Sequence, residues 1–273
     1  MKLVDTHCHL DFDRYQQDLD QVLSRAWEQG LERIMIPGID LESSRRVIKL
    51  ASTDPRLFAA VGVHPNSAET WDQKSASRLR SLASHPGVIA IGEIGLDYYR
   101  NPDKRDLQEH VLTEQLDIAL DLELPVILHV RNQSGKDRSC IMDLINILEG
   151  WTKKVVDQGR DQRQGRWGVV HSFSGNLEEA QKLASLGFFL GITGPVTYPR
   201  AEEMQRVAAG APRSRLLIET DGPFLTPHPH RGKRNEPSYV KFVAEKISEL
   251  MGVPVGEAAE LTTENADHLF EWS

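Results

Sequence analysis

Six residues of the chain have side chains and positions that suit metal chemistry. His7 and His9 are separated by a single residue, and four more candidates each end a short run of Val, Ile, Leu and small residues. These four are Glu93, His129, His171 and Asp221. Imidazole nitrogens and carboxylate oxygens bind zinc, manganese, iron and nickel well, whereas magnesium is less suited to a histidine-rich shell. The pattern therefore predicts a divalent-metal centre.

The pattern is informative because its members occur together. Side chains alternate along a strand, so His7 and His9 share a face, and Cys8 points the opposite way as a small buried residue. A His-x-His pair alone is a modest signal, and a lone histidine at a strand end could be a hydrogen-bonded core residue. The two carboxylates could instead pair with an arginine or cap a helix. Ionisable groups at buried strand ends need a partner, however, and a shared metal supplies one.

Six ligands are too many for one tetrahedral ion. Two divalent ions about 3.5–4 Å apart that share a carboxylate would use the whole set, with zinc, manganese or magnesium as the candidates. Glu93 is the expected bridge, because it is the carboxylate from the middle of the strand series. A water activated by both metals would attack the substrate, and Asp221 could accept a proton from that water. Glu93 and Asp221 are therefore the candidate catalytic residues.

Eight short runs rich in Val and Ile alternate with amphipathic stretches, which is typical of βα units. Several runs are continuously apolar, as expected of strands buried on both faces. The expected strands are Lys2–Thr6, Arg33–Pro37, Phe58–Val63, Val88–Glu93, Pro125–His129, Gly168–His171, Phe188–Ile192 and Leu216–Glu219. A chain of 273 residues with 40% hydrophobic residues is long enough for one α/β barrel of about 250 residues. The sequence predicts a single-domain TIM-type (β/α)8 barrel over residues 1–273, with its site at the carboxyl ends of the strands.

Helix signals lie between these runs. Leu112, Leu116 and Ala119 repeat at helical spacing and predict a face that packs on the barrel. Asn176 and Glu179 have the spacing of a capping box at the start of another helix.

The polar stretch Trp151–Arg166 contains five basic residues. A nucleic-acid patch there is disfavoured, because the stretch precedes a strand and so belongs at the face of the barrel away from the site. We expect it to be a solvated insertion.

Composition narrows the function classes. The net charge of -8 should repel nucleic acid and anionic membranes unless a local patch binds them. Two cysteines, Cys8 and Cys140, make no disulfide framework or structural zinc site, which indicates a reducing compartment. The N-terminus lacks the apolar run of a signal peptide, and no run approaches a membrane span. We expect a cytoplasmic protein with no membrane association and no obligate protein partner.

The chain resembles the TatD family of metal-dependent deoxyribonucleases, within the amidohydrolase-like metallo-dependent hydrolases. The resemblance covers nearly the whole chain. Its motifs are DTHCHLDF at 5–12, GVHP at 62–65, IGEIGLDYY at 91–99, QLDIALDLELPVILHVR at 115–131, HSFSG at 171–175 and ETDGPFL at 219–225.

This resemblance implies that His7, His9 and Asp221 hold one ion, that His129 and His171 hold the second, and that Glu93 touches both. It also implies a deoxyribonuclease, 3′-5′ exonuclease-like, that acts on single-stranded DNA or 3′ ends. Two departures bear on the substrate. The motif at the fifth strand reads HVRN rather than the more usual HSRD, and the stretch at 151–166 is longer than expected.

Substrate contacts are expected from the loops at the catalytic face. Phosphate could be bound by Arg131, by Arg200 and by a basic cluster after the eighth strand. That cluster comprises His228, His230, Arg231, Lys233 and Arg234. His64 could contact substrate or pack beneath the site, and Tyr98 and Tyr99 could stack on bases or lie in the core. Surface arginines on loops are commonplace, so the alternative interpretation is that these side chains have a structural role and do not contact substrate.

Two other functions remain open at this point. A dinuclear site also supports hydrolysis of a small ester, lactone, amide or phosphoester, because the fold does not determine the substrate. Such a substrate predicts a closed pocket where the basic loop lies. A protein that binds metal or nucleic acid without turnover is disfavoured, because Asp221 is present where a proton acceptor is needed.

Overall fold

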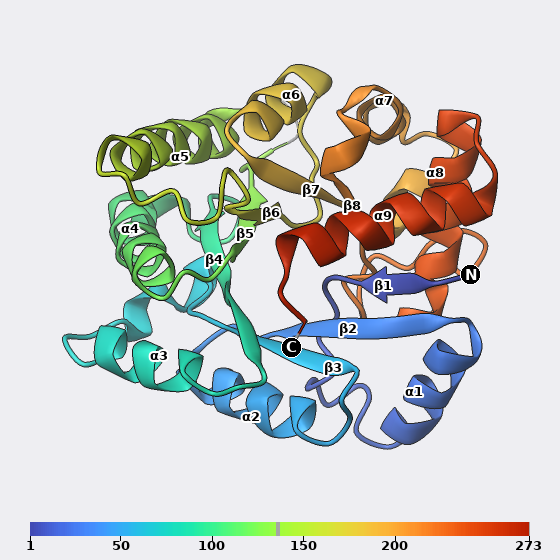
Figure 1. Cartoon of the computed structure of the whole chain (residues 1–273), viewed down its shortest axis with the longest axis horizontal. Helices are drawn as coiled ribbons and strands as arrows, with labels where there is room; N and C mark the ends of the chain where they lie inside the picture. The colour runs from blue at the N-terminus through green and yellow to red at the C-terminus, as the bar shows by residue number, and fades with distance from the viewer. Residues whose placement is uncertain (135–136, 273) are drawn as a thin grey trace.

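The computed structural model describes residues 1–134 and 137–272 and has the predicted barrel. Eight parallel strands pair in chain order, from β1 to β8, and a helix follows each of them (Figure 1). The strands are β1 Leu3–Asp5, β2 Leu31–Pro37, β3 Leu57–Val61, β4 Val88–Asp97, β5 Val126–Arg131, β6 Gly168–Val170, β7 Phe188–Ile192 and β8 Leu216–Ile218. Each lies on one of the eight runs expected from the sequence.

The helices form the outer layer. They are α1 Leu19–Glu28, α2 Leu41–Ala51, α3 Ser75–Ala83, α4 Arg105–Asp121, α5 Ser139–Asp157, α6 Leu177–Ser185, α7 Glu202–Gly210, α8 Val240–Met251 and α9 Val255–Leu269. Leu112, Leu116 and Ala119 of α4 are buried, as their spacing predicts. Asn176 and Glu179 form the expected capping box at the start of α6.

The barrel is closed where β8 meets β1, just beyond the ends of both strands. Thr6 donates its amide to the carbonyl of Ile218 at 3.2 Å, and Asp221 donates to His7 at 2.8 Å. His9 in turn donates to the carbonyl of Gly222 at 2.8 Å. The first and last candidate ligand segments are therefore held against each other by backbone hydrogen bonds.

The interior of the barrel is apolar and is closed at the amino ends of the strands by the C-terminal segment. Val4, Met35, Ile127 and Leu217 belong to one buried cluster that also includes the end of α9 and the residues after it. The ring of Trp272 packs against Phe58 there, with ring centroids 4.9 Å apart. Figure 1 shows α9, in red, crossing the near side of the barrel and bringing the C-terminus over the strands. The opposite mouth is left for the site.

The stretch Trp151–Arg166 differs from the solvated insertion that its polarity suggests. Its first seven residues are the last turns of α5, in which Trp151 and Val155 are buried. Arg163 is also buried, and its guanidinium donates to backbone carbonyls. Lys153, Lys154 and Asp157 lie on the exposed face of α5, so the sequence of this half-buried helix has the composition of a polar segment. Within the residues described, no helix is long and apolar enough to cross a bilayer.

Candidate metal centre

The period of two along each strand places the candidate ligands directly above the apolar interior. On β5, Ile127 belongs to the interior cluster, and His129 is two residues further along on the same face. The same relation holds between Val169 and His171 after β6. On β8, Leu217 belongs to the same interior cluster, and Glu219 follows two residues further along, just beyond the end of the strand. The hydrophobic pattern of the strands therefore aims these side chains into the mouth.

Glu93 enters the mouth from within β4. The register between β4 and β5 shifts between Ile91 and Ile94, so the strand is irregular where the glutamate lies. Its amide donates to the carbonyl of Gly38 at 2.8 Å. Irregular pairing of this kind changes the direction in which a side chain points, and here it delivers a carboxylate that is only 3% exposed.

The two oxygens of Glu93 face two different groups of histidines. Oε2 lies 3.6 Å from Nε2 of His7 and 3.7 Å from Nε2 of His9. Oε1 lies 2.8 Å from Nδ1 of His129 and 3.2 Å from Nε2 of His171. One carboxylate thus joins two clusters of nitrogen ligands.

Asp221 completes the first cluster. Its Oδ1 lies 3.8 Å from Nε2 of His7 and 3.5 Å from Nε2 of His9. The residue has a φ of 54°, which is uncommon outside glycine but tolerated by aspartate. Because its amide is bonded to the carbonyl of His7, this backbone geometry fixes the carboxylate beside both imidazoles.

The donor set fits divalent ions. Three groups of candidate ligand atoms lie within 4.8 Å of one another, and these are His7–Glu93–His171, His7–His9–Asp221 and His64–Glu93–His129. Most of the separations above exceed a normal hydrogen bond, and they are close to the roughly 3.3–3.6 Å between neighbouring ligands around a tetrahedral ion with bonds of about 2.0–2.2 Å. The Nε2 atoms of His7 and His9 face each other at 3.3 Å. Their Nδ1 atoms have no hydrogen-bond partner among the residues described.

The electrostatics of the centre also suit a cation. Burial alone would raise the pKa of Glu93, but the charges and hydrogen bonds of the surrounding histidines hold it well below its usual range. Burial would lower the pKa of His171, but the charge of Glu93 and a hydrogen bond to Glu219 raise it well above its usual range. Positive charge therefore collects around the buried carboxylate, where a metal would place it.

A second layer of carboxylates lies behind the histidines. Glu219 accepts from Nδ1 of His171 at 3.2 Å and from the amide of Ser172. A Cβ at Gly191 would lie 2.4 Å from a carboxylate oxygen of Glu219, so only glycine leaves room for this side chain. Asp97 lies with Oδ2 3.5 Å from Nε2 of His129. Neither acid was expected at the site from its place in the sequence, although Glu219 lies two residues after Leu217 of β8, whose side chain belongs to the interior cluster.

His64 lies directly beside Glu93, closer to the centre than a residue that only contacts substrate or only packs beneath the site would need to lie. It is 8% exposed, and its Nε2 lies 3.5 Å from Oε1 of Glu93. Burial lowers the pKa of His64 to about 3, so the ring is neutral. Its Nδ1 accepts from the amide of Asn66 at 3.0 Å, which leaves the proton on Nε2 toward Glu93. The ring therefore lies beside the candidate ligands with its N–H directed at Glu93 and the cavity, rather than with a lone pair that could bind an ion.

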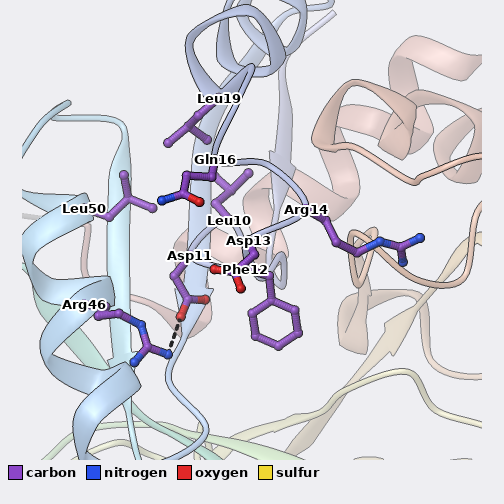
Figure 2. Close-up of a pocket in the computed structure, with 9 residues that line it drawn as sticks. All are labelled: Leu10, Asp11, Phe12, Asp13, Arg14, Gln16, Leu19, Arg46 and Leu50. Atoms are coloured by element: carbon purple, nitrogen blue, oxygen red, sulfur yellow. Dashed lines mark hydrogen bonds and ion pairs between the residues drawn. The ribbon is translucent and has the colours of Figure 1, made fainter.

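The mouth opens into a cavity of about 670 Å³, whose lining includes the candidate residues His9, Glu93, His129, Arg131, His171 and Asp221. His64, Phe12, Phe224 and Arg100 line it as well. A second cavity, of about 790 Å³, adjoins it behind the loop that follows β1 (Figure 2). Phe12 lines both cavities and so separates them.

Comparison with known proteins identifies the chain. The model of the TatD-related DNase family matches residues 4–271. The chain belongs to this family. It is 39% identical to YabD of Bacillus subtilis, an uncharacterized metal-dependent hydrolase, over 98% of both chains. It is 34% identical to a 3′-5′ ssDNA/RNA exonuclease, TatD of Cronobacter turicensis, over 98% of this chain and 97% of that protein. The crystal structure of YJJV, a TatD homologue from Escherichia coli, superimposes with a TM-score of 0.87 at 34% identity and 98% coverage of each chain.

Only some of the residues expected to contact substrate in this TatD-family hydrolase lie at the cavity. Arg131 lines the cavity and lies over the ring of Tyr99, 3.9 Å from its centre, while Tyr99 is 53% exposed. Tyr98, in contrast, is fully buried and donates its hydroxyl to Glu109 and Asp143 at 3.1 and 3.0 Å.

The basic cluster after β8 does not converge on the cavity. Arg231 lies over the ring of Tyr198, 4.6 Å from its centre, and is not among the residues that line the cavity. Arg234 pairs with Asp18 at 2.7 Å, and the ring of His230 stacks on Tyr239 at 4.4 Å. These side chains stabilise the loop, because their partners are supplied within the fold.

Proposed function

We propose that this chain is a divalent-metal-dependent nuclease that removes nucleotides from the 3′ end of single-stranded DNA with two ions at the mouth of the barrel. The division of the Glu93 carboxylate between two histidine clusters carries the proposal, because it prepares two adjacent metal sites with one shared ligand. The 34% identity to a protein named as a 3′-5′ ssDNA/RNA exonuclease supports the choice of substrate.

The geometry favours a specific assignment of the ligands. His7, His9 and Asp221 would hold one ion, His129 and His171 the second, and Glu93 both. When bound, the two ions would lower the pKa of an attacking water and neutralise charge at the scissile phosphate.

Asp221 is the candidate proton acceptor. Burial would raise the pKa of Asp221, but a hydrogen bond from His9 and the charges of neighbouring histidines lower it. The carboxylate is thus ionised at neutral pH and 14% exposed at the cavity. It can hold a proton taken from water at the reaction centre, while His64 orients a phosphate oxygen through Nε2–H. Arg131 would contact a phosphate next to the scissile one.

The test is an assay of metal-free protein to which magnesium, manganese or zinc is added back. Single-stranded DNA labelled at the 5′ end in one sample and at the 3′ end in another reports the polarity of cleavage. We expect a ladder from the 5′ label, early release of the 3′ label, and a loss of about 10²- to 10⁴-fold in Asp221→Asn.

A panel of carboxylic esters, lactones and small phosphodiesters runs beside the DNA. Asp157→Asn is the matched control, because Asp157 is exposed at the end of α5, away from the mouth. Turnover of a small substrate alone would reject the nuclease while leaving the hydrolase. Equal activity of the Asp221 variant and its control would reject the assigned role of Asp221.

A further inference from the structure

Two phenylalanine rings stand at the edge of the metal cavity, where apolar side chains would not be expected to face solvent. Phe224 is 44% exposed and lines the cavity with Phe12. The two ring centroids are 6.0 Å apart in an edge-on arrangement. The ring of Phe12 also stacks on the candidate ligand His9, at 4.7 Å and an interplanar angle of 22°. The pair therefore lies beside the reaction centre without being buried in the core.

The backbone fixes both rings relative to the candidate ligands. Phe12 donates its amide to the carbonyl of His9 at 3.2 Å, and Phe224 donates to the carbonyl of Asp221 at 2.9 Å. Each ring thus sits three residues beyond a ligand, at the end of a hydrogen-bonded turn. Asn235 also donates to the carbonyl of Phe224 at 2.6 Å. The backbone that carries the exposed ring is therefore held in place by hydrogen bonds at both its amide and its carbonyl.

The two sides of the cavity differ in chemistry. One side carries Arg131 and Arg100, and neither has a carboxylate within ion-pair distance among the residues described. The other side carries the phenylalanine pair. Figure 2 shows the Phe12 ring pointing away from Leu10 and Leu19 of the adjoining cavity. A ligand that spans the cavity should offer anionic groups to one side and a flat apolar face to the other.

We propose that Phe12 and Phe224 form a stacking platform for the base next to the scissile phosphate of a single-stranded nucleic acid. The proposal rests on the proposed nuclease function and specifies how its substrate is bound. Stacking of a base on an aromatic side chain contributes about 1–3 kcal/mol and tolerates any base, because every base has a π-face. Loss of the platform should therefore weaken binding about 5- to 150-fold without creating sequence preference.

The test measures stacking directly. Short single-stranded DNA carries 2-aminopurine at the 3′-terminal position, the second or the third position, and its fluorescence is quenched when the base stacks. All proteins carry Asp221→Asn and contain manganese, so that the DNA stays intact.

We expect quenching at one position, its loss in Phe224→Ala, and its retention in Phe224→Trp. Phe12→Leu, which keeps the volume but removes the ring, should reduce it. Met142→Ala is the matched control, because Met142 is 45% exposed on α5 and does not line the cavity.

A second measurement, in proteins that retain Asp221, compares kcat/KM for DNA with a normal and an abasic nucleotide at the quenched position. The ratio of the two kcat/KM values should fall toward one in Phe224→Ala.

Quenching that is the same in Phe224→Ala as in the protein that retains Phe224, or that occurs at no position, would overturn the platform even if the DNA is cleaved. Quenching that depends on Phe224 in a protein that cleaves no DNA would support the platform and reject the nuclease. A dimer that dissociates in Phe224→Ala, with unchanged quenching, would assign the ring to self-association instead.

Discussion

At the scale of single residues, the centre depends on acids that touch the histidines from behind. His171 presents Nε2 to Glu93 while its Nδ1 is bonded to Glu219. This second bond orients the ring, so that Nε2 faces the cavity. Glu219 is completely buried, and the glycine at position 191 gives it space. The fold therefore leaves a buried volume for the side chain that orients one candidate ligand.

The variant Glu219→Gln should weaken metal binding while leaving the fold intact. The amide keeps the size of the carboxylate and can still accept from Ser172, but it loses the charge that raises the basicity of His171. We expect a 10- to 100-fold loss of affinity, measured by titration of manganese against a chromophoric chelator. Glu178→Gln, on the exposed side of α6, should bind like the parent protein. Equal affinity of both variants would contradict the role of Glu219.

The candidate ligands could be predicted from the sequence because each follows a run of apolar strand residues, and strand alternation indicates the direction of their side chains. The same rule could have found Glu219, two residues before Asp221. It could not place side chains on longer loops: Arg231 turns to Tyr198 rather than the cavity, and Tyr98 is buried while its neighbour Tyr99 is exposed. Those outcomes depend on partners brought in from distant parts of the chain.

At the scale of elements, the C-terminal helix is held in place by the segment that follows α5. Arg163 donates to the carbonyls of Glu123 at 3.0 Å and Arg166 at 2.8 Å, and also to the carbonyl of Leu269 at the end of α9. Arg166 donates to the carbonyl of His268 at 3.1 Å. Cationic donors at the last turn satisfy free carbonyls and oppose the negative end of the helix dipole. These contacts keep the residues after α9 beneath the barrel.

Replacing this buried guanidinium should destabilise the protein. Arg163→Met keeps much of the side-chain volume but leaves three carbonyls without their donor, and we expect a loss of about 2–3 kcal/mol in the free energy of unfolding. Urea unfolding followed by tryptophan fluorescence measures it. Arg160→Met removes an exposed pair with Asp121 and should change stability by less than about 0.5 kcal/mol. Similar losses of unfolding free energy in both variants would show that the hydrogen bonds of Arg163 make no specific contribution to stability.

The elements themselves were predictable because strands buried on both faces have a continuous apolar pattern. The prediction of a solvated insertion at 151–166 was wrong for a related reason. A helix that is half exposed shows its charged residues in the sequence, while its buried contacts, such as that of Trp151 with Trp167 at 5.5 Å, come from residues of other elements. The extension of β4 to Asp97, beyond the candidate ligand Glu93, could not be predicted either, because it depends on pairing with β5.

At the scale of the whole molecule, the charge of -8 and the proposed polyanionic substrate must be reconciled. Long-range attraction is absent, since a net negative protein repels nucleic acid. The arginines that line the cavity are Arg100 and Arg131. Three side chains of the expected basic loop after β8, those of His230, Arg231 and Arg234, contact partners within the fold. Binding should therefore rely on a few short-range contacts, on stacking and on the metal centre rather than on a broad basic surface.

This arrangement predicts a shallow dependence of substrate binding on salt. Each phosphate neutralised by a basic side chain contributes about 0.7 to the slope of log K against log salt for a single strand. Two contacts would raise KM about 7-fold between roughly 50 and 200 mM salt, whereas six would raise it a few hundredfold. Steady-state assays of single-stranded DNA at several salt concentrations measure the slope. Arg131→Gln should reduce it by about 0.7, and Arg160→Gln, at the opposite face, should leave it unchanged. A steep slope that Arg131→Gln does not alter would place the phosphate contacts elsewhere, on a surface that compensates for the net charge.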